Sequence, residues 1–237
     1  MRELKITHLY PELLNLYGDK GNIASLKCRA EWRDISVVVT EVSAEDKIDF
    51  ENTDILFLGG GGDRELKTVL NCLTPFKNEL SDYIEKGGVM ITVCDGFPLL
   101  GKNLVVGNET VEGLGILDIT TALSEERLIG DVLAECDIDG ESFLVSGFEN
   151  RAGVTDIKGE TPFLKVVSGN GETDGVIKNN LFASYFHGPL LPKNPELCDI
   201  ILKRALVKKY GDAELTPLDD EFENEASEVM RKRLLKG

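Results

Sequence analysis

Basic residues are scarce in this sequence, and their scarcity excludes one class of partner. The chain has 26 lysines and arginines against 42 aspartates and glutamates, which gives a net charge of -16 at neutral pH. Binding to a nucleic-acid backbone needs a basic face, so we expect no nucleic-acid partner. The acidity itself indicates solubility rather than a particular activity.

Histidine is rare and paired cysteines are absent. The two histidines are His8 and His187, and none of the five cysteines belongs to a C-x-x-C pair. This spacing does not favour a metal site. An odd number of cysteines favours reduced thiols over a disulfide framework.

Long hydrophobic runs are also missing. The longest, at residues 53–58 and 89–93, are far too short to span a bilayer. The N-terminal residues lack the long apolar segment and the small-residue cleavage site of a signal peptide. We therefore expect a cytoplasmic protein with no membrane span.

Strands and helices alternate through the first hundred residues. This order predicts an α/β fold, a doubly wound and mostly parallel sheet flanked by helices. Short β-rich segments between residues 104 and 168 predict added antiparallel strands that are attached to the same sheet. With no repeat and no linker, residues 1–237 are expected to form a single domain. The strands expected in the main sheet lie at residues 4–10, 35–42, 54–58, 89–93 and 181–186, and the helices at 23–32, 64–86, from 194 onward and 218–235.

Cys94 is the candidate nucleophile. It follows the apolar run at residues 89–93 directly and is followed by Asp95 and Gly96, the pattern of a strand-to-helix nucleophile elbow. The helix expected from about Pro98 would point its N-terminus at the sulfur and favour the thiolate. The alternative interpretation is a buried core cysteine.

His187 is the candidate base. It also follows an apolar strand, and Gly188 and Pro189 end that strand, so the imidazole should lie at the same carboxyl edge as Cys94. The alternative is a loop histidine with a structural hydrogen bond. His8 has no adjoining glycine turn and is interpreted as structural.

The glycine run at residues 59–62 follows the strand at 54–58. Its Gly60 and Gly61 N–H groups, together with the N–H of Asp95, are the candidate donors to an oxyanion. A phosphate-binding loop is the alternative, but no Lys-Ser/Thr pair follows the glycines and the G-x-G-x-x-G spacing is not met.

Several longer strings carry a resemblance that covers nearly the whole chain. The chain resembles the glutaminase subunits of lipid II isoglutaminyl synthase, which are cobyric-acid-synthase-like class I amidotransferases. The matching strings are LNLYGDKGN (residues 14–22), GGGGDRE (59–65), TVC (92–94), EGLGILD (112–118), RLIGD (127–131), GFEN (147–150) and HGPLLPKN (187–194).

This resemblance implies that the chain hydrolyses L-glutamine to glutamate and ammonia, with Cys94 as nucleophile and His187 as base. It implies a heterodimer with a Mur-ligase-like synthetase subunit, which would use ATP and Mg to amidate D-glutamate of lipid II. No cofactor is expected on this chain itself. Arg127 matches an arginine near the glutamine entrance, where it would pair with the substrate carboxylate.

The chain departs from the family at three positions. Asp95 stands where glycine usually follows the cysteine, and a carboxylate there should raise the thiol pKa unless it points away. Pro98 replaces a glutamine, and Pro189 replaces the glutamate that completes many class I triads. We therefore expect a Cys–His dyad, with Asp19 or Glu149 as a possible third member.

Two other interpretations stay open at this point. One is an amidotransferase for another acceptor, such as a corrin carboxylate. The other is a catalytically dead interaction subunit of the same fold, an interpretation that Asp95 and Pro98 support.

Overall fold

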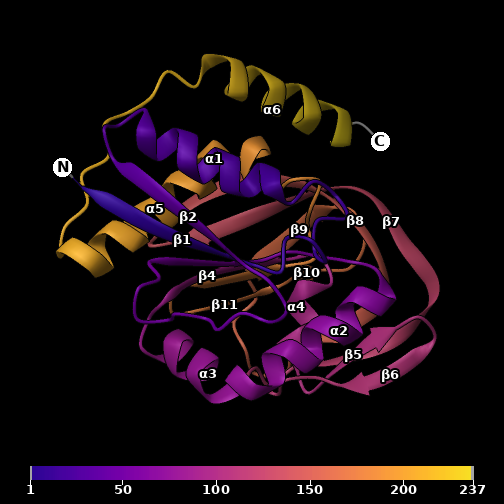
Figure 1. Ribbon diagram of the computed structural model, residues 1–237. Helices are drawn as coiled ribbons and strands as arrows, with labels where there is room; N and C mark the ends of the chain where they lie inside the picture. The colour runs from indigo at the N-terminus through magenta and orange to yellow at the C-terminus, as the bar shows by residue number, and fades with distance from the viewer. Residues whose placement is uncertain (1, 236–237) are drawn as a thin grey trace.

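The computed structural model describes residues 2–235 and contains a six-stranded sheet between two layers of helices (Figure 1). Five of the strands are parallel, and the edge strand β11 pairs with β12 in the antiparallel sense. This confirms the predicted α/β class. In spatial order the strands are β11 (Val176–Lys178), β12 (Leu181–Ser184), β4 (Val89–Val93), β3 (Ile55–Leu58), β1 (Glu3–Leu9) and β2 (Ser36–Val42).

Helices cover both faces of this sheet. The helices α1 (Lys20–Glu31) and α5 (Pro195–Tyr210) pack on one face, and α2 (Asp63–Leu73) and α3 (Lys77–Glu85) pack on the other. Strands β3 and β4 are buried along their whole length, which is why their sequences are continuously apolar rather than alternating. Among residues 2–235, no helix combines the length and the apolar character that crossing a membrane requires.

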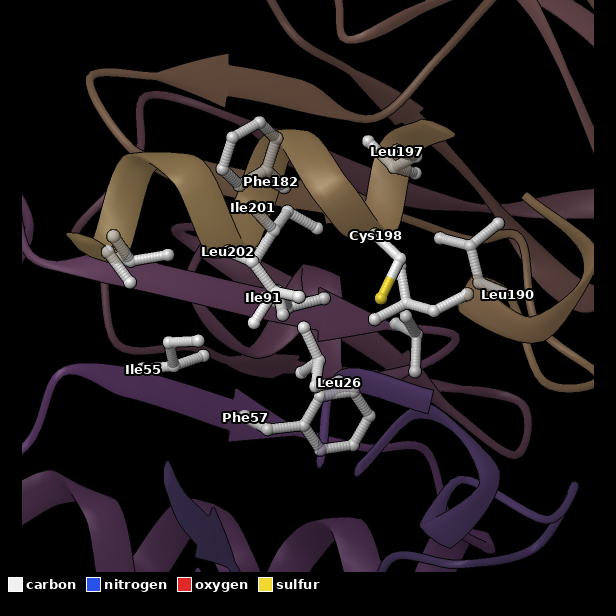
Figure 2. Packing of buried hydrophobic residues seen from close by; sticks show 14 of the residues in the cluster. Leu26, Ile55, Phe57, Ile91, Phe182, Leu190, Leu197, Cys198, Ile201 and Leu202 are labelled. Carbon is white, nitrogen blue, oxygen red and sulfur yellow. The ribbon is translucent and has the colours of Figure 1, made fainter. Parts of the chain in front are cut away.

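Alternate residues of each central strand pack on opposite faces. Ile55 and Phe57 of β3 point toward α1 and α5, whereas Leu56 and Leu58 point toward α2 and α3. Figure 2 shows the first of these layers, where Leu26 of α1 lies near Phe57 and the α5 side chains lie over the strands. A rigid, doubly covered sheet is a suitable base for a site at its carboxyl edge.

The middle of the chain differs from the prediction. It forms a separate four-stranded antiparallel sheet in the order β10-β9-β7-β8, and not strands added to the main sheet. In the described residues, the backbone pairing between the two sheets is one isolated bridge from Phe148 to His187. The strands are β7 (Thr120–Ile138), β8 (Glu141–Asp156), β9 (Leu164–Ser168) and β10 (Thr173–Asp174), and β5 (Asn103–Val106) pairs separately with β6 (Glu109–Glu112).

The long β7–β8 hairpin explains this difference. Asp139 and Gly140 both have positive φ, 57° and 84°, which is the requirement of a tight two-residue hairpin turn. The hairpin pairs its inner backbone groups over most of its length, and the outer edge of β7 pairs with β9 rather than with a strand of the main sheet. It buries Val132 and Val145 in the same core as α1 and α5.

Helix boundaries differ from the prediction in two places that bear on the site. Helix α1 begins at Lys20, with Asp19 as the residue before it, so it starts three residues earlier than expected. The helix expected near Pro98 is the single turn α4 (Gly96–Leu99). The last helix, α6 (Glu221–Leu234), lies near β7, β8 and the 3-10 turn Leu191–Lys193.

Candidate active site

Cys94 lies directly after β4 in a backbone conformation that few side chains adopt. Its φ is 55°, in the left-handed region, and its side chain is buried. The residue type at position 96 is constrained as well, because a Cβ at Gly96 would lie 2.4 Å from the carbonyl oxygen of Gly59. A strained nucleophile followed by an obligatory glycine is the geometry of a nucleophile elbow.

His187 follows the neighbouring strand. Ser184 of β12 pairs in register with Val93 of β4, so Cys94 and His187 both emerge from the carboxyl edge of adjacent parallel strands. The His187 side chain is buried, and neither of its ring nitrogens has a hydrogen-bond partner among the residues that the structure describes. The imidazole is therefore free to exchange a proton with a group at this edge.

The glycine run at residues 59–62 packs against Cys94. A Cβ on Gly60 would lie 2.5 Å from Cys94 Cβ and 2.8 Å from its Sγ, so only glycine fits there. The Gly60 N–H donates a hydrogen bond of 2.9 Å to Asp19 Oδ2. In this arrangement the Gly60 N–H is engaged by a carboxylate, so of the three predicted oxyanion donors we expect Gly61 and Asp95 to act.

The electrostatics around Cys94 favour the neutral thiol. Burial raises the pKa of Cys94 well above its usual range, and the Asp95 carboxylate raises it further. The thiol donates a hydrogen bond to Asp95 Oδ2 at 3.7 Å. The predicted helix dipole does not offset these effects, since α4 has only four residues.

Burial also shifts the pKa values of Asp95 and His187. Burial raises the pKa of Asp95 to about 6. Burial and, to a lesser extent, the Lys193 cation together lower the pKa of His187 to about 4. At neutral pH the site therefore holds a thiol and a neutral imidazole that is able to accept a proton.

Arg127 lies where the β7–β8 pairing is irregular. The register shifts between Leu123 and Leu128, and this bulge brings Arg127 to a cavity that Asp95, Pro98 and Tyr185 also line. Its Nε donates a hydrogen bond of 2.5 Å to Asn150 Oδ1. The structure thus brings a guanidinium to the same cavity as the residue after the nucleophile.

Within residues 2–235, neither candidate for a third catalytic residue forms a hydrogen bond with His187. The Asp19 carboxylate bonds to Gly60, and burial raises the pKa of Asp19 to about 6. Glu149 accepts hydrogen bonds from Arg151 Nε at 2.9 Å and from Asn170 Nδ2 at 2.7 Å. In the described structure these two acids support the walls of the site rather than the base.

Sequence reasoning missed three residues of this site. Tyr17 stacks on His187, Asn150 connects Tyr17 to Arg127, and Arg151 is buried with its guanidinium 4.6 Å from the Tyr185 ring centre. Tyr17 lies in a turn, where no periodicity marks an aromatic residue as functional. Arg151 carried a signal, because it stands two residues after Glu149 and so shares its face of the strand.

In the part of the chain that the structure describes, no three or more His, Cys, Asp or Glu residues are grouped so that they could hold a metal ion.

Comparison with known proteins identifies relatives along nearly the full length. Residues 5–195 match the family described as the CobB/CobQ-like glutamine amidotransferase domain. The lipid II isoglutaminyl synthase (glutamine-hydrolyzing) subunit GatD of Staphylococcus aureus (strain N315) is 39% identical, over 98% of this chain and 97% of that protein. The GatD subunit of Streptococcus pneumoniae (strain ATCC BAA-255 / R6) is 38% identical, over 95% of this chain and 90% of that protein.

The fold has known counterparts as well. A glutamine amidotransferase from Thermotoga maritima superposes with a TM-score of 0.53, covering 99% of this chain and 96% of its own, at 14% identity. At that identity the likeness shows the fold alone. The resemblance inferred from the sequence motifs is confirmed by the family match and the two GatD relatives. The chain belongs to the family of CobB/CobQ-like glutamine amidotransferases and is an enzyme of that class.

Proposed function

We propose that this enzyme hydrolyses L-glutamine to glutamate and ammonia, with Cys94 as nucleophile and His187 as general base. The observation that carries the proposal is the pairing of Ser184 of β12 with Val93 of β4. Because these adjacent strands are parallel and in register, Cys94 and His187 follow them at the same edge of the sheet. The left-handed backbone of Cys94 and the unpartnered ring nitrogens of His187 support it.

The proposed reaction has two halves. His187 takes the thiol proton as the sulfur attacks the side-chain amide carbon of glutamine, and the carbonyl oxygen becomes an oxyanion. The C–N bond then breaks, and the ammonia leaves with the proton that His187 returns, so that a thioester remains on Cys94. In the second half His187 deprotonates a water, the water attacks the thioester, and glutamate leaves as the sulfur regains its proton.

Two backbone donors and one side chain would hold the substrate. The Gly61 and Asp95 N–H groups are the proposed oxyanion donors, because the Gly60 N–H is already bound to Asp19. Arg127 would pair with the α-carboxylate of glutamine, since it lines the cavity that adjoins Asp95.

The ammonia would serve a second subunit. The two full-length relatives are named as subunits of a lipid II isoglutaminyl synthase, and we extend that assembly to this chain. The proposed partner is a Mur-ligase-like synthetase that carries the ATP and Mg and binds lipid II. It would amidate the D-glutamate of the peptidoglycan precursor with the ammonia released here.

Ammonia release by the purified chain, alone and with the synthetase subunit, tests this proposal. Cys94→Ala is expected to abolish release, because no thioester forms without this sulfur. His187→Ala is expected to lower turnover by roughly 10²–10⁴-fold, the usual contribution of a general base.

Cys28→Ala is the matched control, since Cys28 is an exposed cysteine on α1, and it should keep full activity. Glutaminase activity that survives in Cys94→Ala would overturn the mechanism.

A further inference from the structure

The His187 imidazole is oriented without any hydrogen bond to its ring. In the described part of the chain, both ring nitrogens lack hydrogen-bond partners. What fixes the ring is packing: Tyr17 stacks on it with centroids 4.0 Å apart and planes 20° apart, and Phe148 meets it edge-on at 5.6 Å. A stacked aromatic face restricts the tilt of the imidazole while leaving both nitrogens free for proton transfer.

The other end of Tyr17 connects to the substrate side of the site. Its hydroxyl accepts a hydrogen bond of 2.9 Å from Asn150 Nδ2. The amide oxygen of Asn150 accepts the 2.5 Å bond from Arg127 Nε. One continuous path thus runs from Arg127 through Asn150 and Tyr17 to the face of His187.

The loop that carries Tyr17 is itself fixed in place. Gly18 has a φ of 77°, which turns the chain immediately after Tyr17. The Asn15 side chain accepts the Lys20 N–H at 3.0 Å, and the Leu16 N–H donates to the Gly60 carbonyl at 3.3 Å. The tyrosine is therefore presented by an ordered turn, and its half-buried ring lies over His187.

We propose that Tyr17 is a positioning residue with two separable roles. Its ring holds the His187 imidazole in line for proton transfer. Its hydroxyl, through Asn150, holds Arg127 where it meets the substrate carboxylate. The inference rests on the proposed glutaminase function and deepens it, because it connects the group that binds glutamine to the group that moves the proton.

Two substitutions at Tyr17 separate these roles in steady-state ammonia release from glutamine. Tyr17→Leu removes the ring and the hydroxyl, and kcat should fall by roughly 10²-fold, the cost of a base displaced by about 1 Å. Tyr17→Phe keeps the ring and removes the hydroxyl alone, so this variant should retain most of the wild-type kcat. Its KM should rise roughly two- to tenfold, the effect of one lost neutral hydrogen bond on the arginine.

Tyr210→Phe is the matched control, because it removes a hydrogen-bonded tyrosine hydroxyl at the end of α5, and it should change neither constant. A Tyr17→Leu variant with wild-type kcat would overturn the first role. A Tyr17→Phe variant with wild-type KM would overturn the second.

An NMR measurement tests the stacking of Tyr17 on His187 independently of enzyme activity. The chain has two histidines, so its imidazole protons give two sets of NMR signals, and His187→Gln assigns them. The face of Tyr17 should shift the His187 ring protons upfield. That shift should persist in Tyr17→Phe and disappear in Tyr17→Leu, while the His8 signals, which report on packing against Phe57, stay in place.

The two proposals can fail separately. If the wild-type chain and its complex release no ammonia while the His187 shift depends on Tyr17 as described, the glutaminase proposal fails and the stack stands. If ammonia is released and the His187 signals are the same in all Tyr17 variants, the positioning inference fails and the Cys94 mechanism stands.

Discussion

Asp95 places a carboxylate beside the Cys94 sulfur, which has to ionise in the proposed mechanism. The thiol of Cys94 donates to this carboxylate, and burial raises the pKa of Asp95 to about 6. A carboxyl group whose pKa is higher in the folded state than its ordinary 3.8 binds its proton more tightly when folded. It therefore costs stability as the pH rises from about 4 to 6, and the full cost is present above that range.

Asp95→Asn should remove this cost. The variant is expected to be more stable than the parent at pH 7.5, by about 3 kcal/mol, with the difference vanishing below about pH 4. Urea unfolding at several pH values measures it. Asp118→Asn is the control, because Lys102 lowers the pKa of the exposed Asp118 and no gain is expected there. A gain that is the same at pH 4 and pH 7.5 would contradict the argument.

Arg127 contributes to binding in the proposed mechanism, and not to the proton transfer. Arg127→Ala should raise KM for glutamine by roughly 10- to 100-fold, the loss of a charge-assisted hydrogen bond, with a smaller effect on kcat. Steady-state kinetics over a wide range of glutamine concentrations decides this. An effect confined to kcat would assign Arg127 a different role.

At the scale of the elements, what could be predicted followed from hydrophobic patterning. The runs that became β3 and β4 are continuously apolar because both faces of the sheet are covered, and their ends located Cys94 and the glycine run. The separate four-stranded sheet was missed, since the charged and exposed residues near the β7 bulge obscure the continuity of a 19-residue strand.

The residues of the site were predictable only where they follow a strand that the hydrophobic pattern reveals. Cys94 and His187 each follow an apolar strand, so their positions could be inferred from the topology. The stacking of Tyr17 and the bond from Asp19 to Gly60 depend on how a turn folds against a distant loop. Such contacts leave no local signal in the sequence.

The glycine run provides a sharp test of packing at the elbow. Gly60→Ala would place a methyl group 2.5 Å from Cys94 Cβ, so the loop or the nucleophile must move. We expect ammonia release to fall on the order of 10²-fold and the free energy of unfolding to fall by about 1–3 kcal/mol.

Gly62→Ala in the same loop is the control. Its new methyl group would meet only the end of the flexible Glu65 side chain at 2.7 Å, and Gly62 has an ordinary extended conformation. The control should keep both activity and stability. Equal behaviour of the two variants would show that the contact with Cys94 is not the sensitive one.

At the scale of the whole molecule, the resting site is poorly set for ionising its thiol. Cys94 is buried and bound to Asp95, and ammonia released without an activated acceptor is wasted. We expect docking of the synthetase partner near the carboxyl edge to turn Asp95, so that its N–H faces the oxyanion and its carboxylate faces away.

The purified chain should then be a poor glutaminase that becomes a good one in the complex. Steady-state ammonia release at matched glutamine concentrations, with and without the partner, measures the difference in kcat/KM. Equal values in the two conditions would refute this gating and leave the Cys94 mechanism standing.

The bridge between the two sheets has one more consequence. Phe148 and His187 exchange reciprocal backbone hydrogen bonds of 3.2 and 3.0 Å, so the proposed base also takes part in one of the contacts that join the second sheet to the first. Another is the buried Asp174 carboxylate of β10, which accepts hydrogen bonds from Ser184 and Tyr185 at the end of β12. If the sheets part locally on heating, His187 is displaced while the parallel core is still intact. Thermal inactivation of the enzyme would then precede the melting of its parallel core.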